Sequence, residues 1–160
     1  MVKKLTTYFG GCLFGAILLS PLYANTQGNK PQSKPDDSNV RPPITKTDLH
    51  IVKRAREILN TESKWNRADN RVCPAEAKTV SLYCALQIAT IEIGGQAEHR
   101  GAALQEARFV IDEIARDRNY EHRLMNYNND PTTTFSDIQE VLSITESLIT
   151  LRLKANGIKQ

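Results

Sequence analysis

Apolar residues recur at helical spacing along most of the chain, and this pattern restricts the possible folds more than any other feature of the sequence. No segment shows the sustained alternation of apolar and polar residues that marks a half-buried strand. Apolar side chains instead fall three and four positions apart, which gathers them on one face of a helix. The pattern predicts an all-α, single compact domain of four main helices, with one short extra turn at residues 119–126. The four are expected at residues 45–62, 74–93, 97–116 and 134–155.

The segment 74–93 is predicted to be the central buried helix. It carries two apolar stripes on different sides, and a helix that is apolar on two sides packs between neighbours. Pro74 suits a first helical position, and Gly94-Gly95 suits a helix end. Between the stripes runs a polar strip with a single charge. It is either a partly covered face or the floor of a small-ligand cleft, and its members are Glu76, Thr79, Tyr83, Gln87 and Thr90.

The first 24 residues have the layout of a secretory signal peptide. Lys3 and Lys4 precede a run without charge that ends in a helix-breaking Pro21 and a small residue, Ala24. We expect cleavage after Ala24, a periplasmic or secreted protein, and no stable membrane insertion after cleavage. An uncleaved anchor and a lipoprotein cut before Cys12 remain alternatives.

Residues 25–43 are predicted to be a flexible, disordered linker. They hold four of the seven prolines and a single bulky apolar residue, Val40, so they cannot bury enough surface to offset the entropy of ordering. The helical domain is then expected to occupy residues 44–160, a length that supports one hydrophobic core.

The charge balance argues against nucleic-acid binding. Cleavage removes two of the 21 lysines and arginines and no acid, which leaves 19 basic residues against 18 acidic ones and a net charge of +1. A chain so close to neutrality has little to hold a phosphate backbone. No nucleic-acid partner is expected.

Two cysteines, Cys73 and Cys84, remain after cleavage, and their pairing stays open. An even number of cysteines in an oxidising compartment favours a disulfide. A helix that begins at Pro74 would instead separate them by about 15 Å along its axis, whereas a bridge needs Cα atoms within about 7 Å. Only a helix that begins near Val80 permits the bridge.

The residue types used in catalysis and metal binding show no recognised spacing. None of the three histidines, His50, His99 and His122, has a second ligand three or four positions away. There is no glycine-rich phosphate loop, no GxSxG and no visible Cys–His arrangement. The sequence therefore predicts no catalytic residue, no metal and no cofactor.

Four features resemble a family of small all-helical bacterial domains of unknown function. They are Trp65, the Cys73-Pro74 dipeptide, the LYCAL sequence at 82–86 and the Asn-Asn-Asp stretch before the last helix. That family has a Trp, an Ala-Leu central helix and a Trp-Asn-Asp turn, and here Tyr127 stands where the second Trp would be. The resemblance covers roughly residues 48–150. It implies the fold and no activity.

Two functions are compatible with these observations. The first is an exported, non-enzymatic protein that binds another protein as an inhibitor, immunity partner or accessory subunit. Phe109, on the polar side of its helix, would anchor the partner. The alternative is a small-ligand binder or hydrolase that uses the polar strip and the Asn-Asp turn, through Tyr83, Gln87, Asn129 and Asp130.

The polar stretch at residues 125–135 also has an architectural interpretation. Pro131 prevents Asp130 from continuing a helix, and Thr134 and Asp137 stand at capping-box spacing for the last helix. Under this interpretation Tyr127 is buried beneath the turn and the Asn-Asp residues serve the fold.

Overall fold

The computed structural model describes residues 41–157, so the predicted signal peptide and most of the predicted linker lie outside the described residues. Within this range the chain is helical, and the only β pairing is an isolated bridge between Trp65 and Val80. The all-α prediction is therefore confirmed. The elements are α1 (Lys46–Ile58), the 3-10 helix η2 (Glu62–Lys64), α2 (Leu82–Gly94), α3 (Ala102–Ile114), α4 (Arg123–Asn129) and α5 (Phe135–Ala155).

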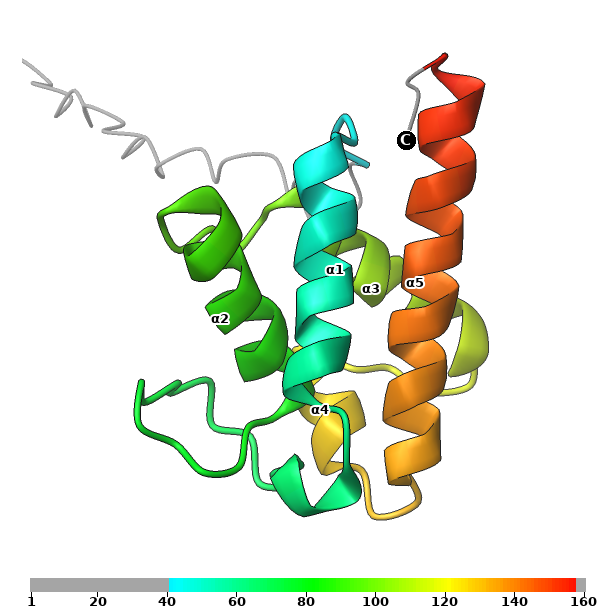
Figure 1. The fold of residues 1–160 in the computed structure, drawn as a ribbon. Coiled ribbons are helices and arrows are strands. Elements are labelled where there is room, and N and C mark those ends of the chain that lie inside the picture. Colours follow the sequence, from blue (N-terminus) through cyan, green and yellow to red (C-terminus); the bar gives the residue numbers. More distant parts are fainter. Residues whose placement is uncertain (1–40, 158–160) are drawn as a thin grey trace, which may run out of the picture. The chain divides into compact units, whose positions relative to one another are not determined.

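The long helices pack around one hydrophobic core. α1 lies between α2 and α5, with α3 behind them (Figure 1). The end of α1 meets the start of α5, where Gln139 Nε2 donates to the carbonyl oxygen of Leu59 at 2.7 Å. The fully buried side chains include Leu59, Leu86, Leu104, Ile111, Ile138, Leu142 and Ile149.

The predicted start of the central helix is wrong. α2 begins at Leu82 rather than Pro74, because Ser81 accepts a hydrogen bond from the Cys84 backbone N–H and caps the helix there. Its first two turns are buried, as expected of a central helix, but Ile91 and Ile93 in the last turn are 46% and 43% exposed. Gly95 ends the helix in a left-handed conformation (φ 80°) that glycine adopts without strain.

The helices with local start signals begin where those signals stand. Thr45 and Asp48 form a capping box at α1, and Thr134 and Asp137 form one at α5. Asp48 is buried and also accepts a hydrogen bond from the Ala103 backbone N–H, so the same carboxylate serves the first turn of α3. That helix begins at Ala102, five residues later than predicted.

The last residues of the predicted linker contact the domain. Arg41 Nη1 donates to Glu106 Oε2 at 3.0 Å, and Arg152 donates to the other oxygen of the same fully buried carboxylate. Arg152 Nη2 also donates to the carbonyl oxygen of Pro42 at 3.2 Å. A buried carboxylate between two guanidinium groups thus ties residues 41 and 42 to α3 and α5.

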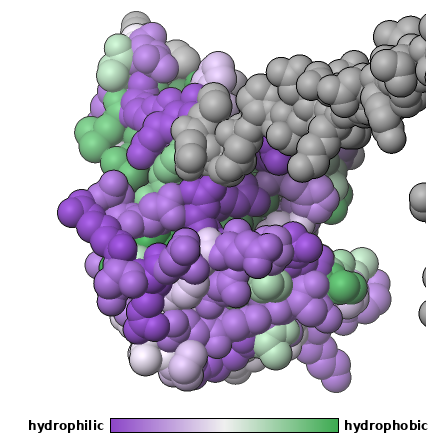
Figure 2. Space-filling model, turned by 180° about the vertical axis from the view of Figure 1, so that it is seen from behind, coloured by the Kyte–Doolittle hydropathy of each residue, from purple (hydrophilic) through white to green (hydrophobic). Residues whose placement is uncertain are grey.

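The described surface is mainly polar. From behind, hydrophilic residues cover most of the described face, and hydrophobic residues show in small separate groups, most clearly at the upper left (Figure 2). None of the helices within residues 41–157 combines the length and apolar character that a membrane crossing demands.

Candidate functional site

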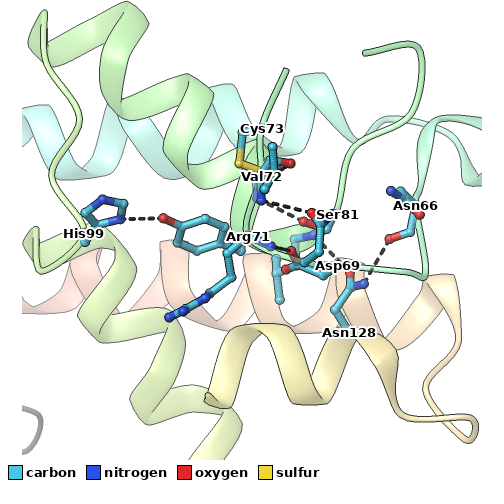
Figure 3. Close-up of a disulfide and its surroundings, with 12 residues drawn as sticks. Asn66, Asp69, Arg71, Val72, Cys73, Ser81, His99 and Asn128 are labelled. Carbon is cyan, nitrogen blue, oxygen red and sulfur yellow. Dashed lines mark hydrogen bonds between the residues drawn. A yellow bond between two sulfur atoms is a disulfide. The ribbon is translucent and has the colours of Figure 1, made fainter. Parts of the chain in front are cut away.

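A disulfide joins Cys73 to Cys84 and fixes the loop that precedes α2. The Cα atoms lie 5.3 Å apart, a separation within the ordinary range for a bridge. Because α2 begins at Leu82, Cys84 lies in its first turn and the loop folds back over it (Figure 3). The sequence permitted this bridge only if the helix began near Val80, and α2 does begin there, at Leu82.

Arg71 stands in this loop in a left-handed backbone conformation, with φ of 61°. Such a conformation is uncommon for a residue other than glycine, asparagine or aspartate, and it persists where neighbouring contacts impose it. Here the Asp69 carboxylate accepts a hydrogen bond from the Arg71 backbone N–H at 2.7 Å, and the disulfide follows two residues later. The side chain of Arg71 extends away from the Asp69–Ser81–Asn128 group, toward the side where His99 lies (Figure 3).

Asn128, at the end of α4, supports the same loop from beneath. It is fully buried, and its Oδ1 accepts from Trp65 Nε1 at 2.8 Å and from the Leu82 backbone N–H at 3.0 Å. Its Nδ2 donates to the Asn66 carbonyl oxygen at 2.9 Å and to Asn129 Oδ1 at 3.2 Å. All four hydrogen-bonding positions of the amide are therefore used.

The next two residues, Asn129 and Asp130, also form hydrogen bonds within the fold. Asn129 accepts from the Asp69 backbone N–H at 2.7 Å and donates to the Asp69 carbonyl oxygen at 2.8 Å. Asp130 accepts from the hydroxyl and backbone N–H of Thr132, from Tyr120 and from Arg118. The bonds from Thr132, followed by that from Tyr120, lower the pKa of Asp130 to about 2.

An open cleft of about 610 Å³ lies beside this loop, between the start of α2, α3 and α4. Its size falls within the range of small-ligand sites. Four arginines and two histidines line it against a single carboxylate, Glu121. The basic residues are Arg71, His99, Arg100, Arg108, His122 and Arg123.

Arg108 shows the electrostatic consequence of this gathering. Burial, followed by the charges of Arg123 and Arg100, lowers the pKa of its guanidinium to about 10. The side chain is held by Gln105 Oε1 at 2.6 Å and by the His99 carbonyl oxygen at 2.9 Å. Two of its five N–H donors thus have protein acceptors in the described structure, and the rest suit a ligand.

Tyr83 and His99 form a pair at the wall of the cleft. The Tyr83 hydroxyl and His99 Nδ1 are in hydrogen-bond contact, and the two rings lie nearly parallel, 3° apart, with centroids separated by 6.0 Å. Tyr83 is buried, and this burial raises the pKa of its hydroxyl. The phenol is therefore neutral at physiological pH.

Only one of the predicted ligand-binding residues lines the cleft. Tyr83 does, whereas Gln87 is buried one turn further along α2 with no partner for its Oε1 among the described residues. Asn129 is the last residue of α4, and Asp130 is its C-cap. The structure does not bring these four side chains together.

Phe109 is less exposed than the sequence pattern suggested. Its ring is partly buried on α3, with the guanidinium carbons of Arg41 and Arg123 at 4.4 and 5.7 Å from its centroid. Arg123 also pairs with Asp112 and lines the cleft, so Phe109 adjoins the basic group without belonging to its lining.

The arginines of the cleft were not singled out from the sequence. They come from the loop, the α2–α3 connection, α3 and α4, so no local spacing links them. The near-neutral total charge conceals this local excess, because Glu121 is the one acidic residue among those that line the cleft, although Asp112 pairs with Arg123. The only local sign is the Gln105-to-Arg108 spacing, which sets both side chains on one helix face.

No group of histidine, cysteine and carboxylate side chains suited to a metal ion occurs within residues 41–157. The polar groups of the cleft are instead mainly hydrogen-bond donors with positive charge. This arrangement can hold an anion.

A protein-family model matches residues 43–147, about two thirds of the chain. Its description is a family of unknown function, DUF6197. The chain belongs to DUF6197. No curated protein and no solved structure matches the chain.

The DUF6197 match confirms the resemblance to a family of small helical domains without an assigned activity. It covers α1 to α4 and most of α5, and therefore every residue that lines the cleft. Arg41 and Arg152, which hold Glu106, lie outside the matched region.

Proposed function

We propose that this DUF6197 protein is a non-enzymatic binding protein that holds an anionic small ligand in the arginine-lined cleft. The observation that carries the proposal is the excess of guanidinium groups over carboxylates in one concave site. Like charges held close together disfavour each other, and an anion placed among them relieves that repulsion.

The anchoring of the cleft residues supports binding in a preformed site. Gln105 and the His99 carbonyl group orient Arg108. The Cys73–Cys84 disulfide and the Asp69 carboxylate hold the backbone of Arg71 in a left-handed conformation. Side chains held in place before the ligand arrives lose less conformational entropy when it binds.

The composition of the cleft favours binding over catalysis. No cysteine, serine, threonine or lysine lines it, and the phenol of Tyr83 is buried with a raised pKa, so it offers no activated thiol, amine or hydroxyl nucleophile. The expected absence of a nucleic-acid partner belongs to this proposal, since the cleft matches the volume of one small ligand rather than a long backbone.

Export to the periplasm or the medium is part of the same proposal. The charge-free leader after Lys3 and Lys4 supports it, and so does the disulfide, because structural disulfides persist mainly in oxidising compartments. An intact mass of the exported protein that begins near Asn25 would support cleavage. A full-length, membrane-extracted species would contradict it.

Calorimetric titration of the purified protein with citrate, sulfate and inorganic phosphate tests the binding function. We expect measurable binding of at least one anion, and we expect Arg108→Gln to weaken it about tenfold or more. Arg116→Gln is the matched control, because it removes the same charge from an exposed side chain outside the cleft. Absence of binding, or equal losses in both variants, would refute a specific cleft.

Protein binding through Phe109 is the second candidate. Two guanidinium groups lie over a partly exposed aromatic ring, an arrangement that suits an acidic partner surface, as an inhibitor, immunity or accessory role would require. Capture of one defined partner from envelope extract that disappears with Phe109→Ala would support it. Capture that the variant leaves unchanged would count against it.

A further inference from the structure

We infer that the ligand of the cleft carries a phosphoryl monoester group, and that Tyr83 is a positioning residue that keeps His99 as a hydrogen-bond donor to that group. The inference rests on the proposed function and names the chemical class of its ligand. It starts from the direction of one hydrogen bond.

The phenolic proton of Tyr83 has one acceptor. Tyr83 is buried, and among the described residues its hydroxyl contacts only His99 Nδ1. Buried polar groups nearly always have a hydrogen-bond partner, and we infer that the phenol donates in this contact. Donation to Nδ1 requires that this nitrogen carry no proton, so the neutral imidazole carries its proton on Nε2.

The Nε2–H group of His99 is then left as a donor on the side of the ring away from Tyr83. Within the described structure no protein acceptor contacts it, and His99 is an exposed lining residue of the cleft. The imidazole Nε2 of His99 could otherwise donate or accept, and the contact with Tyr83 thus makes it a donor. The guanidinium groups of Arg71 and Arg108 are donors as well.

A cleft lined by donors selects a ligand group that only accepts. A phosphoryl monoester above its second pKa, near 6, has two negative charges and three equivalent acceptor oxygens. It can be approached from the loop, α3 and the α2–α3 connection at once, through Arg71, Arg108 and His99. A carboxylate has half the charge and two oxygens, which satisfies fewer of these donors.

The rest of the ligand is expected to be polar. Leu124 and Met125 are the only aliphatic side chains among the lining residues, and the volume exceeds that of a phosphoryl group alone. A phosphorylated sugar has this character. A lipid headgroup with a terminal phosphomonoester has the same anionic chemistry, and the two sources can be separated by experiment.

The first measurement compares two sugars of the same size at pH 8, where the phosphomonoester is a dianion. We expect the purified protein to bind glucose 6-phosphate about tenfold or more tightly than glucuronate, whose anionic group is a carboxylate. Vesicles of phosphatidylcholine with and without phosphatidic acid form a second arm. Binding to glucose 6-phosphate, or only to vesicles with phosphatidic acid, supports the phosphoryl class and identifies its source.

The second measurement addresses Tyr83. Tyr83→Phe should weaken binding of the phosphorylated probe by about threefold to tenfold. It should also shift the ¹⁵N resonances of His99 from the Nε2–H tautomer toward a mixture. Tyr127→Phe removes a phenolic hydroxyl outside the cleft and should change neither quantity.

The outcomes separate the two levels of inference. Equal binding of glucuronate and glucose 6-phosphate overturns the phosphoryl assignment while the anion site stands. An unchanged His99 tautomer in Tyr83→Phe overturns the positioning role. Failure of every anion and vesicle to bind overturns the proposed function itself.

Discussion

The end of α4 with the turn that follows it (residues 128–132, below called the turn) and the arginine cleft are both rich in polar side chains, but their hydrogen-bonding groups are balanced differently. In the turn, both amide N–H groups of Asn128 and one of Asn129 meet acceptors of the protein, and Asp130 accepts from three other side chains and a backbone N–H. In the cleft, donors and positive charges outnumber acceptors. A high density of polar residues is therefore weak evidence for a site, whereas an imbalance of donors and acceptors is stronger evidence.

The loop before α2 has two roles. Asn129 pairs with the backbone of Asp69 on one side of the loop, and Arg71 extends from it on the other. The turn stabilises the position of the loop, and the loop presents a charge to the cleft. Variants in the turn and in the cleft can therefore be compared for stability and for anion affinity.

Asn128→Ala should have the largest effect on stability. It leaves Trp65 Nε1, the Leu82 N–H and the Asn66 carbonyl oxygen without their partner, and unpaired buried polar groups cost about 1–3 kcal/mol each. We expect the free energy of unfolding in urea to fall by roughly 3–5 kcal/mol. Asn119→Ala, at an exposed position, is the matched control and should change it little.

Anion affinity measured on folded Asn128→Ala protein should stay within about threefold of the original value, because the amide does not line the cleft. Complete loss of binding in a variant that remains folded would show that the turn and the cleft are one site. The turn could then no longer be regarded as purely structural and separate from the binding cleft.

Cys73→Ser with Cys84→Ser should affect both regions. Loss of a bridge that closes a loop of 11 residues costs roughly 2–3 kcal/mol in the chain-entropy account. The loop that presents Arg71 also loses a constraint, so anion affinity should fall together with the denaturation midpoint. Reduction of the unmodified protein should reproduce both changes, and a fall in stability with undiminished affinity would exclude Arg71 from binding.

The fold was predictable where the decisive signals are local. The last helix has Thr134 and Asp137 at its start and Asn156-Gly157 at its end, and its predicted bounds hold. The start of α2 was missed although Ser81 is a local capping residue. Helical spacing continues back through residues 74–81, but the disulfide and the contact from Asn128, 46 residues further along the chain, fix the start at Leu82.

The cleft was less accessible to sequence reasoning than the fold. Tyr83 was singled out because a polar strip on a helix is a local pattern. Arg71, Arg100 and Arg108 come together only after the loop and two helices have packed, and total charge averages over the acidic residues elsewhere. A set of binding residues that comes from separate elements shows no recognisable spacing in the sequence.

Acid should weaken the turn through Asp130. Its pKa is about 2 in the folded protein, below the value near 3.9 of an unfolded chain, because Thr132 and Tyr120 donate to the carboxylate. The unfolded chain therefore takes up the proton more readily. The stabilisation is complete above about pH 5 and is lost as pH falls through about 4 toward 2.

Urea denaturation at several pH values between 6 and 2 tests this dependence on Asp130. Asp130→Asn should be less stable than the original protein at pH 6, and the two proteins should converge at the lowest pH. Parallel curves for the two proteins would mean that other carboxylates cause the acid sensitivity.

Thr134→Ala should cost about 1 kcal/mol, since it removes the hydroxyl that accepts from the Asp137 backbone N–H at the start of α5. Thermal denaturation should show a correspondingly small fall in the melting temperature. Anion affinity should not change, because Thr134 caps a helix outside the cleft. A fall in affinity would extend the site into the turn.

Arg108→Gln should have the smallest effect on stability and the opposite sign. The folded protein lowers the pKa of Arg108 to about 10 through burial and the charges of Arg123 and Arg100, so the charged form is less favoured in the folded state than in the unfolded chain. Removing that charge relieves repulsion and also gives up the bonds to Gln105 and His99. We expect the free energy of unfolding to stay unchanged or to rise by up to about 1 kcal/mol, while anion affinity falls about tenfold or more. If stability and affinity both fall sharply, Arg108 is a structural residue like Asn128, and the imbalance of the cleft would have to be explained by the fold rather than by a ligand.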